Sequence, residues 1–262
     1  MTDKISRLEG ILRVHTPLLV AYSGGVDSAC LLAMAHRTLG DSVTGVIADS
    51  PSLPRAALAE ALAVAKSFGA QVEVIATQEF ENEEYLSNPP NRCYFCKSEL
   101  FQRMDGLARE RGFAAIAYGE NADDPAHLRP GSQAAAEFSV IAPLKLAGLT
   151  KADVRELSRQ LDLPTADAPA QPCLSSRIPH GTPVTREALA LVEHGEAYVR
   201  SLGFRVFRVR YQDGTKAGAR VQIAPDEMSA LPALRENLVK GLQRVGFVSV
   251  EIDPQGYSTR ST

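Results

Sequence analysis

Three stretches of this chain carry residues whose type and spacing could do chemistry. Ser-Gly-Gly-Val-Asp-Ser at 23–28 follows an apolar run and precedes a helical pattern. Cys93 and Cys96 form a Cys-x-x-Cys pair, and Cys173 lies in the proline-rich stretch PAQPCLSSRIPHGTPV. The first stretch is typical of an anion site, whereas the thiols indicate metal, redox or nucleophilic chemistry.

The 23–28 stretch predicts a phosphate loop. Its two glycines permit a tight turn and a close approach of the backbone to a ligand. The helix expected directly after them would present unpaired N–H groups and its positive dipole end to an anion, and the serines add hydroxyl donors. Asp27 is unusual there unless it holds a divalent cation; the alternative is an ordinary strand–turn–helix connection with incidental glycines. The residues expected to bind are Ser23, Gly24, Gly25, Asp27 and Ser28.

The cysteine pair brings two thiolates within reach of one metal, one cluster or each other. Cys93 and Cys96 would provide two of the four ligands of a tetrahedral site, and Cys173 is the candidate third ligand. Three cysteines on a cubane cluster leave one iron without a protein ligand, and that iron could hold an exogenous sulfide. Cys30 lies on an apolar helical stripe and is expected to fill the core.

Cys173 also supports a different interpretation on its own. A thiolate close to Arg177 would be more ionised and more nucleophilic than a free one. It could attack an adenylated carboxylate directly and hand over its own sulfur. In a third alternative, the three thiols are unrelated to one another.

The fold class follows from the alternation of apolar runs and helical patterns. Four such β/α repeats predict an α/β fold with a parallel sheet and helices on both faces, which also explains the nearly continuous apolar character of the strands. The strands are expected at 17–22, 42–49, 71–77 and 113–119. The helices are expected at 27–40, 53–69, 97–112 and 150–163, the last with Thr150 as N-cap and Asp153 as capping-box acid.

A second, smaller domain is expected after the proline-rich stretch. Its pattern is helix, two alternating strands, helix and a last strand, which predicts a small α+β domain. The predicted domains are 1–178 and 179–262.

Composition limits the classes of partner. The 262-residue chain has a formal net charge of −3 at pH 7, whereas nucleic-acid binders usually carry a basic excess, so no nucleic acid is expected. No apolar run approaches the roughly 20 residues of a membrane span, and the mixed-charge start is expected to be a short helix rather than a signal peptide. A cytoplasmic location is expected, where four cysteines are more often buried, metal-binding or catalytic than disulfide-bonded.

In its strand–helix setting, the 23–28 loop resembles the pyrophosphate-binding loop of the ATP pyrophosphatase (PP-loop) superfamily. That superfamily includes NAD and GMP synthetases, asparagine synthetase and tRNA-thiolating enzymes, and its loop lacks the Gly-Lys-Ser/Thr ending of a Walker A motif. The resemblance implies that ATP, with Mg²⁺, is cleaved between the α- and β-phosphates and that a substrate oxygen becomes adenylated. It further implies an adenine-side edge in IADSP and a nucleotide contact in YGENADD, through Ala48, Ser50 and Gly119, with Asp123 or Asp124 for magnesium.

A more specific resemblance covers nearly the whole chain. The stretches SGGVDS, RCYFCK, YGENADD, RPGSQAAAEFSVIAPL and PCLSSRIPHG together are similar to the LarE family. This implies a homo-oligomeric, ATP-dependent sulfur transferase, with hexamers among the family's members. Its substrate would be pyridinium-3,5-biscarboxylic acid mononucleotide, and each carboxylate would be adenylated and converted to a thiocarboxylate for the nickel-pincer cofactor of lactate racemase.

The LarE family has two branches with different sulfur sources. One sacrifices a single cysteine, which is left as dehydroalanine. The other carries a [4Fe-4S] cluster on three cysteines and passes on a bound sulfide that some sulfide source must replace. Cys173 matches the shared cysteine, and Cys93 with Cys96 matches the extra pair, so the chain resembles the cluster branch; the sacrificial route stays open.

The resemblance also implies that basic residues of the second domain bind the mononucleotide. FRVFRVRY contains Arg205, and strand alternation puts Arg208 and Arg210 on one face, where two guanidinium groups could grip a phosphate. The alternative is a solvated strand face. The other substrate-binding residues so implied are Arg177, Glu196 and Asp226.

Three other functions remain open on the sequence. An amide-forming ligase of the NAD or GMP synthetase type would share the phosphate loop without needing the three cysteines. A tRNA thiolase would require RNA affinity that falls steeply with salt, which the acidic balance disfavours. A nucleotide-binding scaffold without activity would use the cysteine pair for structural zinc and would release no pyrophosphate.

Overall fold

The computed structural model describes residues 1–125, 130–212 and 217–257, and these form two compact units. The first unit contains residues 1–82 and 91–171, and the second contains residues 83–90 and those from Pro172 onward. The chain thus enters the second unit briefly at Glu83–Pro90, returns to the first, and passes to the second for the last time between Gln171 and Pro172. The domain limits predicted from the sequence, 1–178 and 179–262, concern independent domains and stay a prediction.

The first unit is built on a four-stranded parallel sheet of order β3-β2-β1-β4. The central strand β1 pairs with β2 and β4, and Leu18 lies opposite both Val43 and Ala115. The predicted α/β class with a parallel sheet is therefore confirmed. The strands are β1 (Leu18–Ala21), β2 (Val43–Asp49), β3 (Val72–Ala76) and β4 (Ala115–Tyr118).

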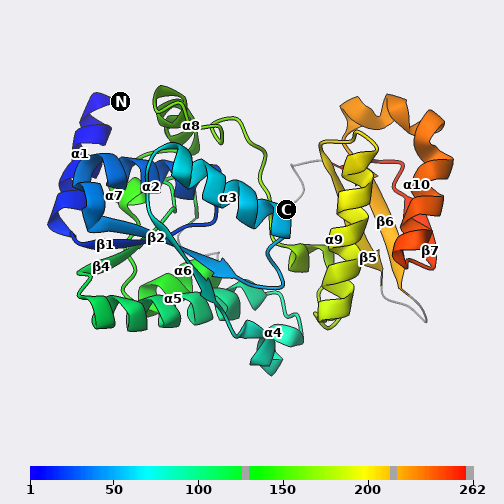
Figure 1. Cartoon of the computed structure of the whole chain (residues 1–262), viewed down its shortest axis with the longest axis horizontal. Coiled ribbons are helices and arrows are strands. Elements are labelled where there is room, and N and C mark those ends of the chain that lie inside the picture. The colour runs from blue at the N-terminus through cyan, green and yellow to red at the C-terminus, as the bar shows by residue number, and fades with distance from the viewer. Residues whose placement is uncertain (126–129, 213–216, 258–262) are drawn as a thin grey trace. The chain divides into compact units, whose positions relative to one another are not determined.

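Both faces of this sheet are covered. Successive residues of β1 point to opposite faces: Leu18 and Val20 belong to one apolar cluster, and Leu19 belongs to another that includes Phe101 and Met104. Figure 1 shows α2 and α3 on one side of the sheet and α5 and α6 on the other. The covering helices are α1 (Thr2–Val14), α2 (Val26–Leu39), α3 (Arg55–Ser67), α5 (Arg92–Arg111), α6 (Pro130–Glu137), α7 (Pro143–Leu146) and α8 (Lys151–Gln160).

The start of α8 has the capping box that the sequence predicts. The Thr150 side chain accepts the backbone N–H of Asp153, and the Asp153 carboxylate accepts the N–H of Thr150 at 2.9 Å. Lys4 of α1 also donates to this carboxylate at 2.6 Å. These bonds, the one from Lys4 first, lower the pKa of Asp153 from 3.8 to about 2.

The lowered pKa predicts how stability depends on pH. A carboxyl group with a lower pKa in the folded state stabilises the fold fully above its unfolded-state pKa and loses that contribution as the pH falls through the folded value. We expect the melting temperature of the wild type to fall more steeply than that of Asp153→Asn between about pH 4 and pH 2. A constant difference between the two proteins across this range would contradict the assignment.

The second unit has a three-stranded sheet of order β5-β6-β7, antiparallel between β5 and β6 and parallel between β6 and β7. Its core is apolar and includes Phe207, Val209, Leu242 and Phe247. The order of elements matches the predicted helix-strand-strand-helix-strand pattern. The elements are α9 (Arg186–Ser201), β5 (Phe207–Gln212), β6 (Gly218–Ile223), the short 3-10 helix η4 (Pro225–Ala230), α10 (Leu231–Val245) and β7 (Ser249–Ile252).

A short segment from the first half of the sequence completes the second unit. It contains α4 (Glu83–Leu86), and the carbonyl oxygen of Leu86 accepts the N–H of Val184 at 2.8 Å. The Asn88 amide donates to the carbonyl oxygens of Pro179, at 2.7 Å, and Thr182, at 2.9 Å. This segment therefore supports the turn that follows Cys173.

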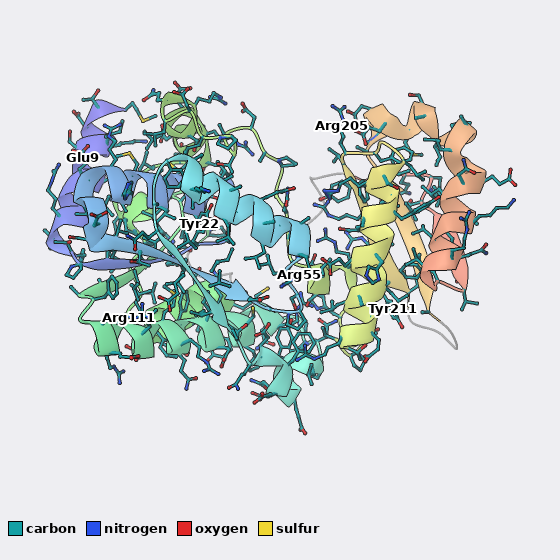
Figure 2. All side chains as sticks on the ribbon, viewed as in Figure 1. Glu9, Tyr22, Arg55, Arg111, Arg205 and Tyr211 are labelled. Carbon is teal, nitrogen blue, oxygen red and sulfur yellow. The ribbon has the colours of Figure 1, made fainter. Side chains whose placement is uncertain are left out.

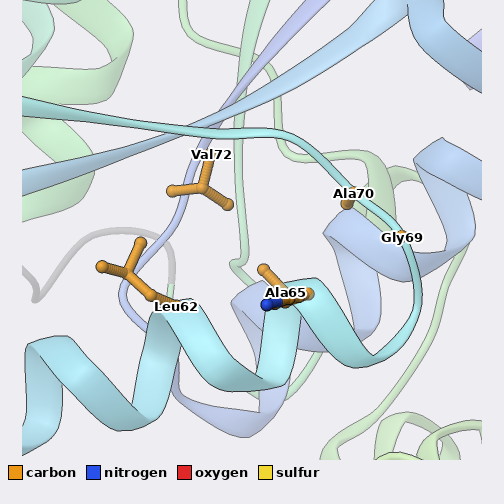
Figure 3. A pocket seen from close by; sticks show the side chains of 6 residues that line it. Leu62, Ala65, Gly69, Ala70 and Val72 are labelled. Carbon is orange, nitrogen blue, oxygen red and sulfur yellow. The ribbon is translucent and has the colours of Figure 1, made fainter.

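A pocket of about 260 Å³, lined by apolar side chains together with Lys66, lies between α3 and the start of β3 (Figure 3). Leu62, Ala65, Ala70 and Val72 are among its lining residues. Val72 is the first residue of β3, whereas the 23–28 loop follows the carboxyl end of β1. Because the strands are parallel, the pocket and the loop lie at opposite ends of the strands. Along the described ranges, no helix has the length and apolarity needed to cross a membrane.

Candidate active site

The predicted phosphate loop connects the end of β1 to the start of α2. Gly24 has a φ of +76°, and a Cβ there would lie 2.5 Å from the Cβ of Ala61 on α3. Gly25 is the N-cap residue of α2 and has no side chain to cap the first N–H groups of that helix. These backbone donors can therefore bind an anion together with the helix dipole.

The serine hydroxyls of the loop hold its turn. Ser28 Oγ accepts the N–H of Ser23 at 3.2 Å, donates to the Gly25 carbonyl oxygen at 3.1 Å and lies 3.1 Å from Ser23 Oγ. Figure 2 labels the neighbouring Tyr22. Its hydroxyl donates to the Ala61 carbonyl oxygen at 2.7 Å, which ties the loop to α3. The loop residues that the sequence singles out therefore lie together.

Gly24→Ala is expected to damage this loop. An alanine would have to adopt a left-handed conformation and would collide with Ala61, so we expect a loss of about 1–3 kcal/mol of stability and weaker binding of pyrophosphate. The control is Gly10→Ala, because Gly10 is an exposed residue inside α1 with open space around it, where alanine should stabilise by up to about 1 kcal/mol. Urea unfolding and calorimetric titration with pyrophosphate measure both effects; equal stability of the two variants would contradict the loop's strain.

The Asp27 carboxylate forms an ion pair with Lys151. It accepts a hydrogen bond from Lys151 Nζ at 2.5 Å and another from the Asn121 amide at 3.2 Å. Lys151 is the first residue of α8, and its backbone N–H donates to Asp123 Oδ2 at 2.8 Å. The site motifs do not point to Lys151, which lies 124 residues from Asp27 along the chain.

Gly119 brings the end of β4 against the phosphate loop. A Cβ at this position would lie 2.8 Å from the backbone nitrogen of Ser28 and 2.9 Å from the carbonyl carbon of Asp27, so only glycine fits. The chain leaves β1 toward β2 on one side, while β4 lies on the other. Ligands of open α/β sheets bind at such a switch point, outside the carboxyl ends of the strands.

The carboxylates predicted as magnesium ligands follow β4. Asp123 Oδ2 accepts the Lys151 N–H, and Asp124 Oδ2 accepts the N–H of Asn121 at 3.1 Å. Oxygen donors of this kind suit Mg²⁺, which takes one or two carboxylates together with substrate phosphates. Asp27, Asp123 and Asp124 therefore stay the predicted magnesium ligands.

Ala48 and Ser50 lie at the carboxyl end of β2, where the adenine-side edge is predicted. Ser50 is buried, and its hydroxyl donates to Glu79. The backbone carbonyl oxygen of Ser50 accepts a hydrogen bond from Arg55 Nη2 at 2.8 Å. The N–H of Ser52 donates to Ser50 Oγ at 3.0 Å. Glu79, which no sequence motif singles out, therefore helps to fix this edge.

Cys93 and Cys96 lie in the first turns of α5, which begins at Arg92 rather than at the predicted Lys97. Residues three apart share one side of a helix, so the two thiols face the same way. Cys93 is exposed and Cys96 is half-buried. Cys30, in contrast, is fully buried, and its burial raises its pKa to about 12, which confirms the prediction that it fills the core.

Cys173 directly precedes the 3-10 helix η3 (Leu174–Arg177) in the second unit and is half-buried. Arg177 Nη1 donates to the carbonyl oxygens of Pro172, at 2.6 Å, and Cys173, at 3.1 Å. Its Nε and Nη2 donate to the two carboxylate oxygens of Glu196 at 2.8 and 3.0 Å. The ion pair is buried, so Arg177 and Glu196 together fix the backbone that carries Cys173.

Arginines surround this turn. Phe207 and Val209 are buried in the core, whereas Arg208 and Arg210 alternate with them on the other face of β5. Arg210 Nη1 donates to the Ser176 carbonyl oxygen at 3.2 Å, and the Arg208 guanidinium lies 4.5 Å from the centre of the Tyr257 ring.

Burial, followed by the charge of Arg177, lowers the pKa of Arg208. Arg177, Arg208 and Arg210 thus lie near the Cys173 turn, and the Glu196 carboxylate pairs with Arg177. Such a group of guanidinium side chains favours the binding of an anion. Of the remaining predicted residues, Asp226 is exposed on η4, and Arg205 pairs with Glu227 at 3.0 Å.

The structure does not bring the three cysteines together into a metal site. Within the described residues, no three His, Cys, Asp or Glu side chains gather closely enough to hold a metal ion, and Cys173 belongs to a different unit from Cys93 and Cys96. The chemistry of the donors nevertheless fits an iron–sulfur cluster, since thiolates are its usual ligands and none of the three is fully buried. The cluster stays a prediction.

Comparison with known proteins first defines the class. No protein-family model matches this chain. The chain is 30% identical to a glutamine-hydrolysing GMP synthase of Thermomicrobium roseum, over 70% of the chain and 39% of that synthase. Together with the parallel sheet and the glycine loop at its switch point, this similarity defines a PP-loop ATP pyrophosphatase.

Two other relatives match almost from end to end. An uncharacterised protein of Synechocystis is 40% identical over 97% of this chain and 96% of its own length. The pyridinium-3,5-bisthiocarboxylic acid mononucleotide synthase of Lactiplantibacillus plantarum is 31% identical over 98% of this chain and 92% of its own. The chain belongs to the family of that synthase, the LarE family of ATP-dependent sulfur transferases, as its motifs predict.

Proposed function

We propose that this chain adenylates the carboxylates of pyridinium-3,5-biscarboxylic acid mononucleotide and converts them to thiocarboxylates for the nickel-pincer cofactor of lactate racemase. The observation that supports this most directly is the 31% identity to the Lactiplantibacillus plantarum synthase over 98% of the chain. The similarity to GMP synthases is confined to a part of those proteins, 39% of the Thermomicrobium roseum enzyme. The amide-forming alternative is therefore the weaker one.

The first half of the proposed reaction takes place at the phosphate loop. A substrate carboxylate oxygen attacks the α-phosphorus of ATP, and pyrophosphate leaves with the electrons of the broken P–O bond. The N–H groups of the loop and the positive end of α2 stabilise the charge that develops on the leaving group. Mg²⁺, held by Asp27 with Asp123 or Asp124, would neutralise phosphate charge, and the Ala48 to Ser50 edge would face the adenine.

The second half transfers sulfur to the acyl adenylate. A C–S bond forms at the carbonyl carbon, the C–O bond to AMP breaks, and AMP leaves. A [4Fe-4S] cluster on Cys93, Cys96 and Cys173 would supply the sulfide from the iron that lacks a protein ligand. In the alternative, Cys173 Sγ attacks the acyl adenylate itself, and elimination across its Cα–Cβ bond then releases the thiocarboxylate and leaves dehydroalanine.

The second unit binds the mononucleotide in this proposal. Arg208 and Arg210 are assigned to its phosphate, because both are half-buried on the face of β5 opposite the core, and Arg210 donates to Ser176 in the turn that follows Cys173. Arg177 and Glu196 contribute by fixing that turn. Asp226 is proposed to contact the substrate, as the sequence predicts. We also propose a cytoplasmic homo-oligomer that takes sulfide from a donor and binds no nucleic acid, in line with the net charge of −3.

Release of AMP and pyrophosphate tests the adenylation step. The protein is incubated with ATP, Mg²⁺ and the dicarboxylated mononucleotide, and both products are quantified with and without sulfide. We expect release that depends on the mononucleotide and fails with the same compound lacking both carboxylates. An amide product formed from ammonia by a variant with all three cysteines changed to serine would instead favour the ligase.

Iron content tests the source of sulfur. After anaerobic reconstitution with iron and sulfide, we expect about four irons per chain, lost in Cys93→Ala, Cys96→Ala and Cys173→Ala. Cys30→Ala is the matched control and should keep its iron, because Cys30 is buried in the core. Absence of iron, with a Cys173 lighter by one hydrogen sulfide after turnover, would replace the cluster by the sacrificial route.

A further inference from the structure

The ion pair between Lys151 and Asp27 raises a question about charge at the phosphate loop. Lys151 Nζ lies 2.5 Å from Asp27 Oδ2, and Asp27 is in the first turn of α2. A lone carboxylate at this point would repel the phosphates of ATP. In the structure, the ammonium group of Lys151 supplies the positive charge that offsets it.

The backbone of Lys151 is fixed, whereas its side chain is not enclosed. The Lys151 N–H donates to Asp123 Oδ2 at 2.8 Å, and the Thr150 capping box sets the start of α8. The Lys151 side chain is 38% exposed, and its four-carbon stem carries a compact charge that can change partners. The ammonium can therefore leave Asp27 without any movement of the helix.

We propose that Lys151 is an exchangeable counter-ion, which pairs with Asp27 in the absence of metal and transfers to the pyrophosphate group when Mg²⁺ binds Asp27. The inference rests on the proposed function, because it takes the 23–28 loop as the ATP site. The Lys151 ammonium and Mg²⁺ would then neutralise the Asp27 carboxylate in turn. The departing pyrophosphate would gain a charge-assisted hydrogen bond from Lys151.

A second ion pair on the same helix provides the control. Lys4 Nζ lies 2.6 Å from Asp153, and the side-chain exposures of this pair, 37% and 21%, are close to the 38% and 23% of Lys151 and Asp27. Exposed or half-exposed pairs of this kind contribute little to stability. Lys4→Met therefore removes an equivalent pair from α8 without touching the loop.

The experiment measures two affinities in the wild type, Lys151→Met, Lys151→Arg and Lys4→Met. Calorimetry gives the affinity for pyrophosphate with Mg²⁺, and electron paramagnetic resonance gives the affinity of the nucleotide-free protein for Mn²⁺, a spectroscopic substitute for Mg²⁺. We expect Lys151→Met to bind pyrophosphate about ten- to a hundredfold more weakly yet Mn²⁺ more tightly, because the competing ammonium is gone. Lys151→Arg should retain part of the pyrophosphate affinity, and Lys4→Met should match the wild type.

The outcomes separate this inference from the function on which it rests. Wild-type affinity for pyrophosphate in Lys151→Met, or a fall in both affinities, would overturn the exchange and leave the ATP site standing. Failure of the unaltered protein to bind pyrophosphate would overturn both.

Discussion

Replacement of Cys173 by alanine is expected to abolish thiocarboxylate formation, by at least about 10³-fold, while ATP binding persists. Both proposed sulfur sources need this thiol, either as a cluster ligand or as the donor itself. The phosphate loop needs none of its contacts, because the loop is built from Ser23, Ser28 and Ala61 within the first unit. The damage should therefore be confined to the second half-reaction.

The measurement compares thiocarboxylate, detected by mass spectrometry, with ATP affinity for the same preparations. Cys30→Ala is the control, because it removes a thiol that is fully buried and has a raised pKa. It should lose some stability but keep thiolation. Unchanged thiolation in Cys173→Ala would refute both sulfur sources at once.

Arg177→Met is expected to have the largest effect on stability, a loss of about 3–5 kcal/mol in the free energy of unfolding. The substitution leaves the Glu196 carboxylate buried without its bidentate partner. It also removes the donor to the carbonyl oxygens of Pro172 and Cys173. Thiolation should fall as well, because the Cys173 turn loses its support.

A double variant separates stability from function at this position. Replacing both charged partners, in Arg177→Met with Glu196→Leu, removes the unpaired charge and should recover much of the lost stability. Activity should stay low, since no guanidinium then holds the backbone of Cys173. Urea unfolding and the thiolation assay give the two quantities; a loss below about 1 kcal/mol in Arg177→Met would show that the pair is not essential to the fold.

The strands and most helices could be predicted because their signals are local. The four parallel strands are apolar runs, and α8 begins at a capping box that is visible in the sequence. The start of α5 could not be placed in the same way. Its first turn contains Cys, Tyr and Phe, which have only moderate helix propensity, and it is supported by distant contacts such as the 2.7 Å hydrogen bond from Tyr94 to Glu137.

The phosphate loop could be predicted from a short motif, whereas its supporting residues could not. Lys151 reaches Asp27 across 124 residues of sequence, and Glu79 reaches Ser50 from the connection after β3. Asn88 supports the turn after Cys173 from the first half of the chain. Such partners are brought together by the fold, and a single sequence carries no periodic signal for them.

The mass of the product tests the central claim most directly. Reconstituted protein, ATP, Mg²⁺, sulfide and pyridinium-3,5-biscarboxylic acid mononucleotide are incubated without oxygen and analysed by mass spectrometry. The proposed function predicts that each carboxylate oxygen exchanged for sulfur appears with one AMP and one pyrophosphate. Pyrophosphate release without any thiocarboxylate, or an amide product in its place, would contradict it.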